Sequence, residues 1–288
     1  MTAAAEVVRL RGAGGLGLAA NRYGPPDGPV VLFLHGAGQT RHSWHRTAAT
    51  VAQAGFSVLC VDHRGHGDSD WPEDSEYEIE HFADDLEAIL DTLDSPPVVV
   101  GASLGGLATL VAQGRNDRQL FRAVVLVDIT PRIDASGADR ILSFMAERPD
   151  GFASLEEAAD AIAGYTGRPR SDGDVTRLAR VLRQDEESGR WRWHWDTRFL
   201  AGKTGGAITE RAEMIHARLL DAARSITVPL LVVRGSLSDV VDAAAVAELV
   251  REVPGARSFD VRGAGHMVAG DENDAFTGAV LDFLGGLP

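Results

Sequence analysis

The 288-residue chain contains very little cysteine and lysine, and it has no long apolar run. Its one cysteine, Cys60, cannot form an internal disulfide, so cysteine usage fits a reducing compartment. No stretch approaches the roughly 20 apolar residues that a membrane-spanning helix needs. Glu6 and Arg9 interrupt the only apolar run near the first residue, where a signal peptide would lie. These absences predict a cytoplasmic protein with no membrane partner.

Positive charge is also scarce. The chain carries 28 Lys and Arg against 42 Asp and Glu, a formal net charge of −14. Phosphate recognition needs clustered basic charge, so nucleic acid is not expected as a partner. The 44% of hydrophobic residues is typical of a globular protein with a large core. A small molecule is therefore the expected partner, and the composition leaves the oligomeric state open.

Short β-branched runs alternate with segments of helical periodicity, which predicts an α/β fold with a mostly parallel, doubly wound sheet. We expect strands at 6–11, 16–22, 30–34, 56–61, 98–100, 123–127, 229–233 and 258–261. Helices are expected at 44–54, 79–93, 104–113, 243–253 and 275–284.

The alternation breaks between Pro131 and Ser225, where no strand of the sheet is expected. Helical segments instead follow one another at 141–147, 155–162, 175–183 and 208–223. The sequence therefore predicts a core domain of residues 1–130 and 226–288 and a helical cap of residues 131–225. Such an insertion would cover the carboxyl ends of the strands, where open α/β sheets bind ligands.

The most informative motif is Gly101-Ala102-Ser103-Leu104-Gly105, which fits G-x-S-x-G between a predicted strand and a predicted helix. In so tight a turn the flanking residues must be small, and Ser103 projects above the sheet edge. The helix N-terminus there favours developing negative charge. A glycine-rich turn with an incidental serine is the alternative, but the strand-turn-helix context favours a nucleophile.

A serine hydroxyl is a weak nucleophile and needs a base. The histidines after Ser103 are His194, His216 and His266. His266 follows the last predicted strand, which is where the order nucleophile, acid, base places the base. His194 lies between two tryptophans and His216 within a helix, so packing or surface roles suit them better. The sequence predicts His266 as the base.

Two carboxylates could orient that base, and the chemistry needs only one to fix its tautomer. Asp239 lies in the loop after the strand at 229–233, and Asp128 ends the strand at 123–127. Both loops open on the carboxyl edge of the sheet. The usual placement predicts Asp239 as the acid, and Asp128 is left to cap the turn into the insertion.

An oxyanion hole needs two convergent N–H groups. Leu104, directly after the nucleophile, is expected to supply one and Ala37 of the loop His35-Gly36-Ala37-Gly38 the other, because glycines let a backbone turn its amides inward. No phosphate-loop pattern is present. The loop Asp62–Ser69 is rich in His and Asp, but its spacing matches no metal-ligand set. We expect no metal there, and we expect the charges of this loop to pair with each other.

Tryptophans alternate in the predicted cap, at Trp191, Trp193 and Trp195. They either pack the cap onto the body or line an apolar substrate pocket. Trp193 and Trp195 are the candidate pocket residues.

Five segments of this chain resemble those of the capped α/β-hydrolase superfamily: the loop His35–Gly38, the loop Asp62–Ser69, the turn at Ser103, the loop of Asp239 and Gly265-His266. The resemblance covers nearly the whole chain outside the cap. The resemblance implies the α/β-hydrolase fold and a hydrolase that uses Ser103, His266 and Asp239 without a cofactor. It also implies an esterase-like member, which would cleave a small, apolar carboxylic ester through an acyl-enzyme on Ser103.

The superfamily also includes dehalogenases and epoxide hydrolases, which use an aspartate nucleophile where this chain has Ser103. Its C–C bond hydrolases typically place Asn before the serine and after the tryptophan of the oxyanion loop. This chain has Ala102 before the serine, and His45 follows Trp44. Cleavage of a vinylogous diketone, lactone hydrolysis and perhydrolysis stay open as alternatives. A non-catalytic binding protein is disfavoured because all three triad residues are present.

Overall fold

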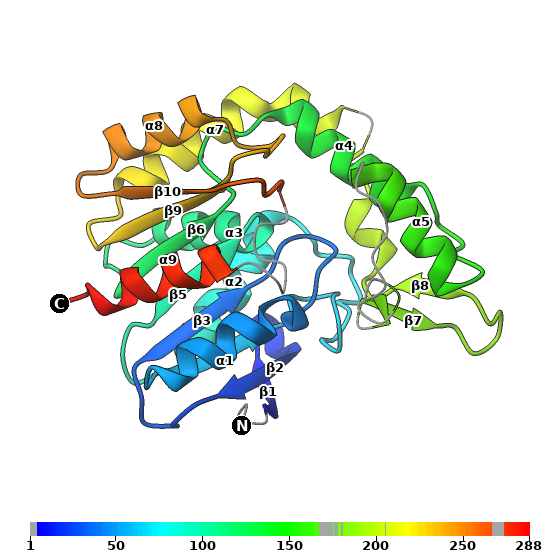
Figure 1. Cartoon of the computed structure of the whole chain (residues 1–288), viewed down its shortest axis with the longest axis horizontal. Coiled ribbons are helices and arrows are strands. Elements are labelled where there is room, and N and C mark those ends of the chain that lie inside the picture. Colours follow the sequence, from blue (N-terminus) through cyan, green and yellow to red (C-terminus); the bar gives the residue numbers. More distant parts are fainter. Residues whose placement is uncertain (1–4, 167–174, 176–177, 180, 205, 267–273) are drawn as a thin grey trace.

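A sheet of eight strands runs through the molecule, in the order β1-β2-β4-β3-β5-β6-β9-β10. The computed structural model describes residues 5–166, 175, 178–179, 181–204, 206–266 and 274–288 (Figure 1). The strands are β1 (Glu6–Arg11), β2 (Gly17–Tyr23), β3 (Val30–Leu34), β4 (Ser57–Val61), β5 (Val98–Ala102), β6 (Ala123–Val127), β9 (Leu230–Gly235) and β10 (Arg257–Val261). The pairs β1–β2 and β2–β4 are antiparallel, and all other neighbours are parallel. The predicted fold class is confirmed.

Helices cover both faces of this sheet. The helices outside the insertion are α1 (His45–Gln53), α2 (Ile79–Leu90), α3 (Leu104–Gly114), α8 (Ala243–Glu252) and α9 (Asp274–Gly285). Successive residues of the central strand β3 point to opposite faces: Leu32 packs in a core layer with Leu110 of α3, and Phe33 in a second layer with Val51 and Phe276. Because both faces are buried, strands such as β3 are apolar throughout.

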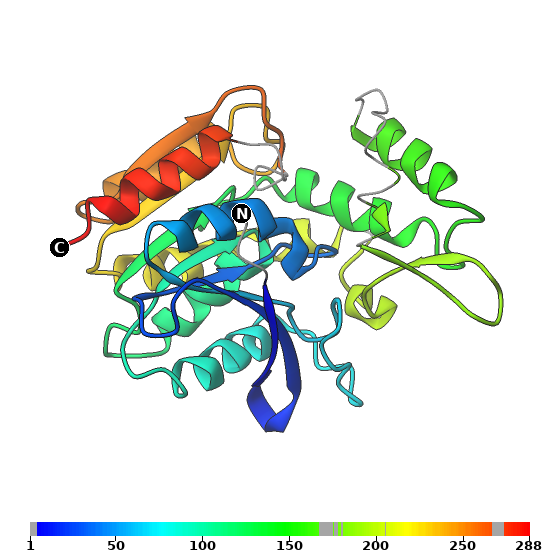
Figure 2. The same ribbon diagram turned by 60° about the horizontal axis from the view of Figure 1, so that its bottom comes forward.

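The insertion between β6 and β9 projects to one side of the sheet (green to yellow in Figures 1 and 2). It contains α4 (Ala135–Ala146), α5 (Leu155–Thr166), β7 (Leu182–Gln184), β8 (Trp191–Trp193), the 3-10 helix η3 (Thr197–Leu200) and α7 (Ala207–Arg224). The helices expected at 141–147, 155–162 and 208–223 are present. The C-terminal half of α7 packs on α3, where Ala222 lies against Gly114.

A small sheet of β7 and β8 was not expected in this insertion. Leu182 pairs with Trp193 in it, and Gln184 with Trp191. The alternating tryptophans from Trp191 to Trp195 have the period of a strand and are the sequence signal for β8. Of the helix predicted at 175–183, residues 176, 177 and 180 lie outside the described residues. Val175 and Leu178 are helical, but the last two residues, Leu182 and Arg183, belong to β7.

The loop after β4 ties the insertion to the core. The Gly67 N–H donates to the carbonyl of His194 at 2.7 Å, and the Asp196 N–H donates to the carbonyl of Gly65 at 2.7 Å. The Tyr77 hydroxyl donates to Oδ2 of Asp196 at 2.6 Å. One edge of the insertion is therefore fixed directly onto a loop at the carboxyl edge of the sheet.

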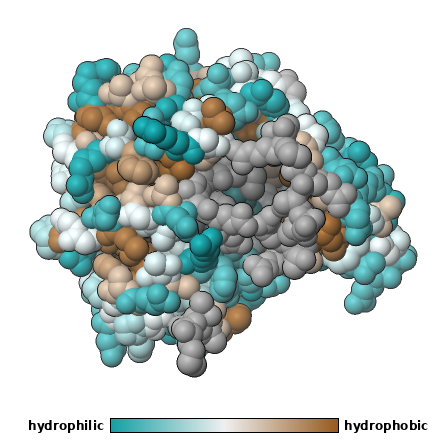
Figure 3. Space-filling model, in the orientation of Figure 1, coloured by the Kyte–Doolittle hydropathy of each residue, from teal (hydrophilic) through white to brown (hydrophobic). Residues whose placement is uncertain are grey.

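The outer surface is mixed in character. Hydrophobic colour occurs in separate patches on the face shown in Figure 3. Single large apolar side chains such as Val7, Met214 and Leu237 are exposed, which is ordinary for a folded protein. In the described part of the chain, no helix combines the length and apolar character needed to cross a membrane.

Replacing Gly105 by Ala should destabilise the fold. A Cβ there would lie 2.5 Å from the carbonyl oxygen of Leu34 and 2.6 Å from its Cβ, and the central strand cannot move away. Overpacking of this kind costs about 1–3 kcal/mol of unfolding free energy. The same change at Gly278 in α9 meets nothing within 4 Å and should stabilise by up to ~1 kcal/mol. Thermal melting of both variants tests this, and equal melting temperatures would contradict it.

Candidate active site

Ser103 stands where β5 meets α3, in a strained backbone conformation. Its φ and ψ are 43° and −110°, in the left-handed half of the map that residues with a side chain rarely adopt. The space beneath it is tight, since a Cβ on Gly101 would lie 2.7 Å from the Gly106 nitrogen. Strain of this kind is typical of functional sites, and it fits the turn that the motif predicts. Because β5 lies between β3 and β6, Ser103 lies between the loops that follow those two strands.

Asp128 follows β6 directly and is fully buried, with φ of 48°. The described residues give its carboxylate three donors from two other loops. Oδ1 accepts the N–H of Gly235 at 2.8 Å, and Oδ2 accepts the hydroxyl of Ser238 and Nδ1 of His266, the latter at 2.7 Å. Because a carboxylate only accepts, Nδ1 must carry the proton, and Nε2 of the neutral ring is then a base.

The sequence predicts Asp239 as the partner of His266, and this prediction is wrong, because the carboxylate that contacts His266 belongs to Asp128. The Asp239 carboxylate instead pairs with Arg140 of α4 at 3.1 Å, and its side chain is 40% exposed. Beside this ion pair α4 packs closely on the loop, since a Cβ on Gly137 would lie 1.9 Å from the Asp239 carbonyl oxygen. The loop presents Ser238 to the buried carboxylate in its place. The available signal was the position of Asp128 at the end of a fully buried strand, where a carboxylate must have partners.

The loop after β3 carries the amides predicted for the oxyanion hole. The Gly36 N–H donates to Oε1 of Gln39 at 3.0 Å, and the Gly38 N–H donates to Nε2 of His66 at 3.2 Å. Between them, the Ala37 N–H has no acceptor among the residues that the structure describes. Gly38 has φ of +73°, and only glycine adopts that value without strain.

The second predicted amide belongs to Leu104, the first residue of α3. The first N–H groups of a helix have no acceptor within the helix, so this one is available to a ligand. The two loops are neighbours, because a Cβ on Gly36 would lie 3.3 Å from Cβ of Ser103. The structure thus brings the Gly36–Gly38 turn against Ser103, as an oxyanion hole requires.

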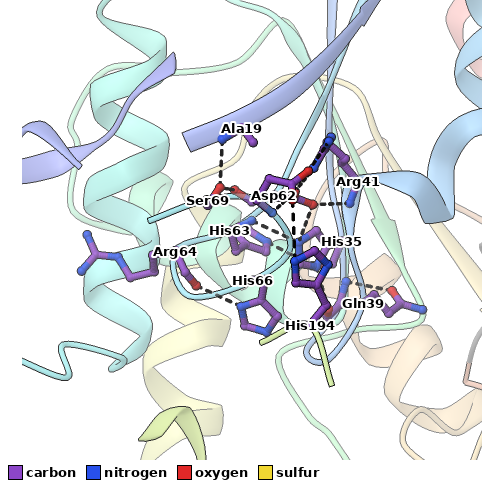
Figure 4. A network of polar contacts seen from close by, with 12 residues as sticks. Ala19, His35, Gln39, Arg41, Asp62, His63, Arg64, His66, Ser69 and His194 are labelled. Carbon is purple, nitrogen blue, oxygen red and sulfur yellow. Dashed lines mark hydrogen bonds and ion pairs between the residues drawn. The ribbon is translucent and has the colours of Figure 1, made fainter. Parts of the chain in front are cut away.

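Three buried histidines lie behind this turn (Figure 4). Nε2 of His35 accepts the N–H of His63 at 3.1 Å, and its Nδ1 donates to the Gly36 carbonyl at 2.8 Å. Nε2 of His63 donates to the His35 carbonyl, and Nδ1 of His66 donates to the carbonyl of Arg64. Burial lowers the pKa of all three rings, most strongly for His35 and His63. These histidines are neutral supports of the backbone.

Buried ion pairs fix the loop Asp62–Ser69 after β4, and the partners of its charged residues lie outside the loop. Asp62 pairs with Arg41, which also binds the carboxylate of Asp68 at 2.6 Å, and Arg64 binds both oxygens of Asp85 at 2.8 Å. The expectation that this loop pairs its charges internally is therefore wrong. Among the described residues, no group of three or more His, Cys, Asp or Glu side chains is arranged to hold a metal ion.

Apolar side chains of the insertion meet the predicted oxyanion residues. Leu142, Met145 and Trp195 pack in one cluster with Leu104, and Ala37 borders it. A Cβ on Gly38 would lie 2.9 Å from Cε of Met145 and 3.7 Å from Nε1 of Trp195. Of the two predicted pocket tryptophans, Trp195 thus lies beside the oxyanion loop, almost completely buried.

Trp193 lies farther out in the insertion. It packs edge-on against Phe144 and Phe152, with ring centroids 6.4 and 5.4 Å away. It lines a pocket of about 330 Å³ together with Met145 and Leu200. Met145 therefore separates this outer pocket from the oxyanion loop.

The fold and these loops agree with a comparison against known families. The model of the alpha/beta hydrolase fold matches residues 29–272. The chain belongs to this family and is a hydrolase of the α/β fold.

Individual relatives are similar over most of their length. The 2-(acetamidomethylene)succinate hydrolase of Mesorhizobium japonicum is 31% identical over 261 residues, covering 90% of this chain and 88% of the relative. An esterase of Mycobacterium tuberculosis is 30% identical over 277 residues, covering 93% and 86%. A crystal structure of E-2-(acetamidomethylene)succinate hydrolase matches with a TM-score of 0.80 at 27% identity, over 98% of this chain and 100% of that one.

Acid should destabilise the protein through the histidines behind the oxyanion loop. Because burial holds their pKa below that of the unfolded chain (about 6.5), only the unfolded state takes up protons as the pH first falls below that value. The free energy of unfolding should then fall by up to ~1.4 kcal/mol per pH unit for each histidine. Urea unfolding followed between about pH 7.5 and 5.5 measures this. An unchanged free energy over that range would count against neutral buried histidines.

Proposed function

We propose that this protein is a serine hydrolase that cleaves a small carboxylic ester, with Ser103 as nucleophile, His266 as base and Asp128 as the acid that orients the base. The observation that carries the proposal is the 2.7 Å hydrogen bond from Nδ1 of His266 to the buried Asp128. It leaves Nε2 as an acceptor at the sheet edge that also carries the strained Ser103.

In the proposed reaction, Nε2 of His266 takes the hydroxyl proton as Oγ of Ser103 attacks the ester carbonyl. The Ala37 and Leu104 N–H groups bind the oxyanion of the tetrahedral intermediate. The imidazolium then donates its proton to the leaving alcohol, and an acyl-enzyme remains. Water, deprotonated by the same nitrogen, attacks the acyl carbonyl and releases the acid. Asp128 stays ionised and stabilises the imidazolium.

The surroundings of the oxyanion loop favour an apolar acyl group. Leu142, Met145 and Trp195 approach this loop from the insertion, and all three offer apolar surface. Such surface binds a hydrocarbon chain better than a charged group. The similarity to a mycobacterial esterase supports the same class of substrate.

A second candidate is suggested by the similarity to 2-(acetamidomethylene)succinate hydrolase. With the same base and acid, Ser103 could attack an amide carbonyl as well as an ester carbonyl, because both reactions pass through a tetrahedral oxyanion. Turnover should be compared on p-nitrophenyl acetate, p-nitrophenyl hexanoate, a γ-lactone, a vinylogous diketone and 2-(acetamidomethylene)succinate. Preference for the hexanoate supports the proposal of an apolar ester substrate. Turnover confined to the acetamido compound or to the diketone would overturn that proposal in favour of the corresponding substrate.

Ser103→Ala should abolish turnover and leave the fold unchanged, because the covalent step is lost. In a well-studied serine protease, loss of the nucleophile costs about 10⁶-fold in kcat. A fluorophosphonate should label the wild type with one equivalent per chain and the variant not at all. Near-normal turnover by a folded Ser103→Ala protein would overturn the mechanism.

Asp128→Asn and Asp239→Asn form a matched pair that tests the orienting acid. At position 128 the change should favour the wrong tautomer of His266 and lower kcat by about 10⁴-fold, as in a serine protease. At position 239 it removes only an exposed ion pair with Arg140, whose energetic contribution is small. Activity and melting temperature are measured for both variants. If Asp239→Asn is the more damaging change to kcat, the assignment is reversed.

A further inference from the structure

We infer that His66 is a positioning residue that holds the oxyanion loop in its active shape, by accepting the Gly38 N–H so that the Ala37 N–H is left for the substrate oxyanion. This inference rests on the function proposed above. It concerns a histidine outside the triad, from the loop that follows β4.

The acceptor role of His66 is fixed by its other nitrogen. Nδ1 lies 2.9 Å from the carbonyl oxygen of Arg64, which can only accept, so Nδ1 carries the proton. In a neutral ring Nε2 then has a lone pair, and it lies 3.2 Å from the Gly38 nitrogen. The ring is fully buried (0% exposed), and burial lowers its pKa, which keeps this tautomer neutral.

The arrangement of the loop shows why this acceptor matters. Gln39 takes the Gly36 N–H, and His66 takes the Gly38 N–H, so the amides on both sides of Ala37 are occupied. A buried N–H without an acceptor costs about 1–3 kcal/mol. Without His66, rotation of the Gly38 N–H toward another acceptor would lower the free energy of the turn. The Ala37 peptide would rotate with it.

The same residue also contacts the insertion. The backbone of His66 forms an antiparallel bridge with Trp195, and its ring packs edge-on against Phe199 at a centroid distance of 5.4 Å. The ring is therefore held from two sides, by the core loop and by the insertion. A rigid acceptor is what a preorganised oxyanion hole requires.

The test compares His66→Gln with His66→Met, two side chains of similar length and shape that differ in having an acceptor. Kinetics on p-nitrophenyl hexanoate and inhibition by a trifluoromethyl ketone, which forms a tetrahedral adduct with serine, are measured for both. We expect His66→Met to lower kcat by about 10²-fold, the cost of a misplaced donor, with KM nearly unchanged. Affinity for the ketone should fall in parallel, and His66→Gln should recover most of both losses.

His194→Met is the matched control, because this histidine also lies where the insertion meets the loop after β4, but its ring lies 3.6 Å from a carboxylate oxygen of Asp68, which is outside the oxyanion loop. It should retain wild-type kcat. Should His66→Met not fold, His66→Asn replaces it, since its amide can reach the Arg64 carbonyl but is too short to reach Gly38. Equal activity of the Gln variant and the acceptor-less variant overturns the inference, as does a loss confined to KM.

Titration with fluorophosphonate separates this inference from the proposed function. If wild type takes up one equivalent but kcat is insensitive to the acceptor at position 66, the inference about His66 fails and the serine mechanism stands. If wild type is not labelled at all, the proposed function fails.

Discussion

A single buried carboxylate organises the edge of the sheet where the proposed site lies. Asp128 has no contact with water, and a charge in that position is tolerated only with several donors around it. Its donors come from the loops after β9 and β10, so the carboxylate fixes three chain segments relative to one another. The strained backbone at Asp128 is tolerated because these contacts over-determine it.

The parallel sheet makes such convergence possible. Six neighbouring strands of the sheet are parallel: β4, β3, β5, β6, β9 and β10. The loops that follow them therefore all open on one edge. Buried ion pairs and neutral histidines then hold those loops, which carry most of the polar groups of the site. The insertion adds apolar surface but also contacts the same supports, through the bonds of residues 194–196 to residues 65–67.

The fold was largely predictable, because apolar runs that are buried on both faces leave a strong pattern in the sequence. The strand at 98–100 continues to Ala102, but its place before Ser103 was clear. The small β7–β8 sheet was missed because three-residue strands carry little periodic signal beside a helical neighbourhood. The tryptophan alternation was the one clue.

The site was predictable only in part. Ser103, His266 and the oxyanion loop lie within recognisable local motifs. The choice between Asp128 and Asp239 depends on which side chain faces inward from its loop, and no local pattern specifies that, since Asp239 pairs with Arg140 of α4, far away in the sequence. The pairing of Arg41 with Asp62, and of Arg64 with Asp85, likewise joins residues about 20 positions apart and leaves no local pattern.

The bond between Asp128 and His266 spans 138 positions of the chain. All eight strands of the sheet, the turn that carries Ser103 and the loop of residues 35–38 precede His266 in the chain, so they can all be synthesised before that histidine. Contacts of such sequence separation form late, because the chain between them must first be ordered. A nascent chain would therefore carry the proposed nucleophile but no positioned base until β10 has joined the sheet. Under the proposed mechanism, hydrolytic competence thus coincides with the end of folding.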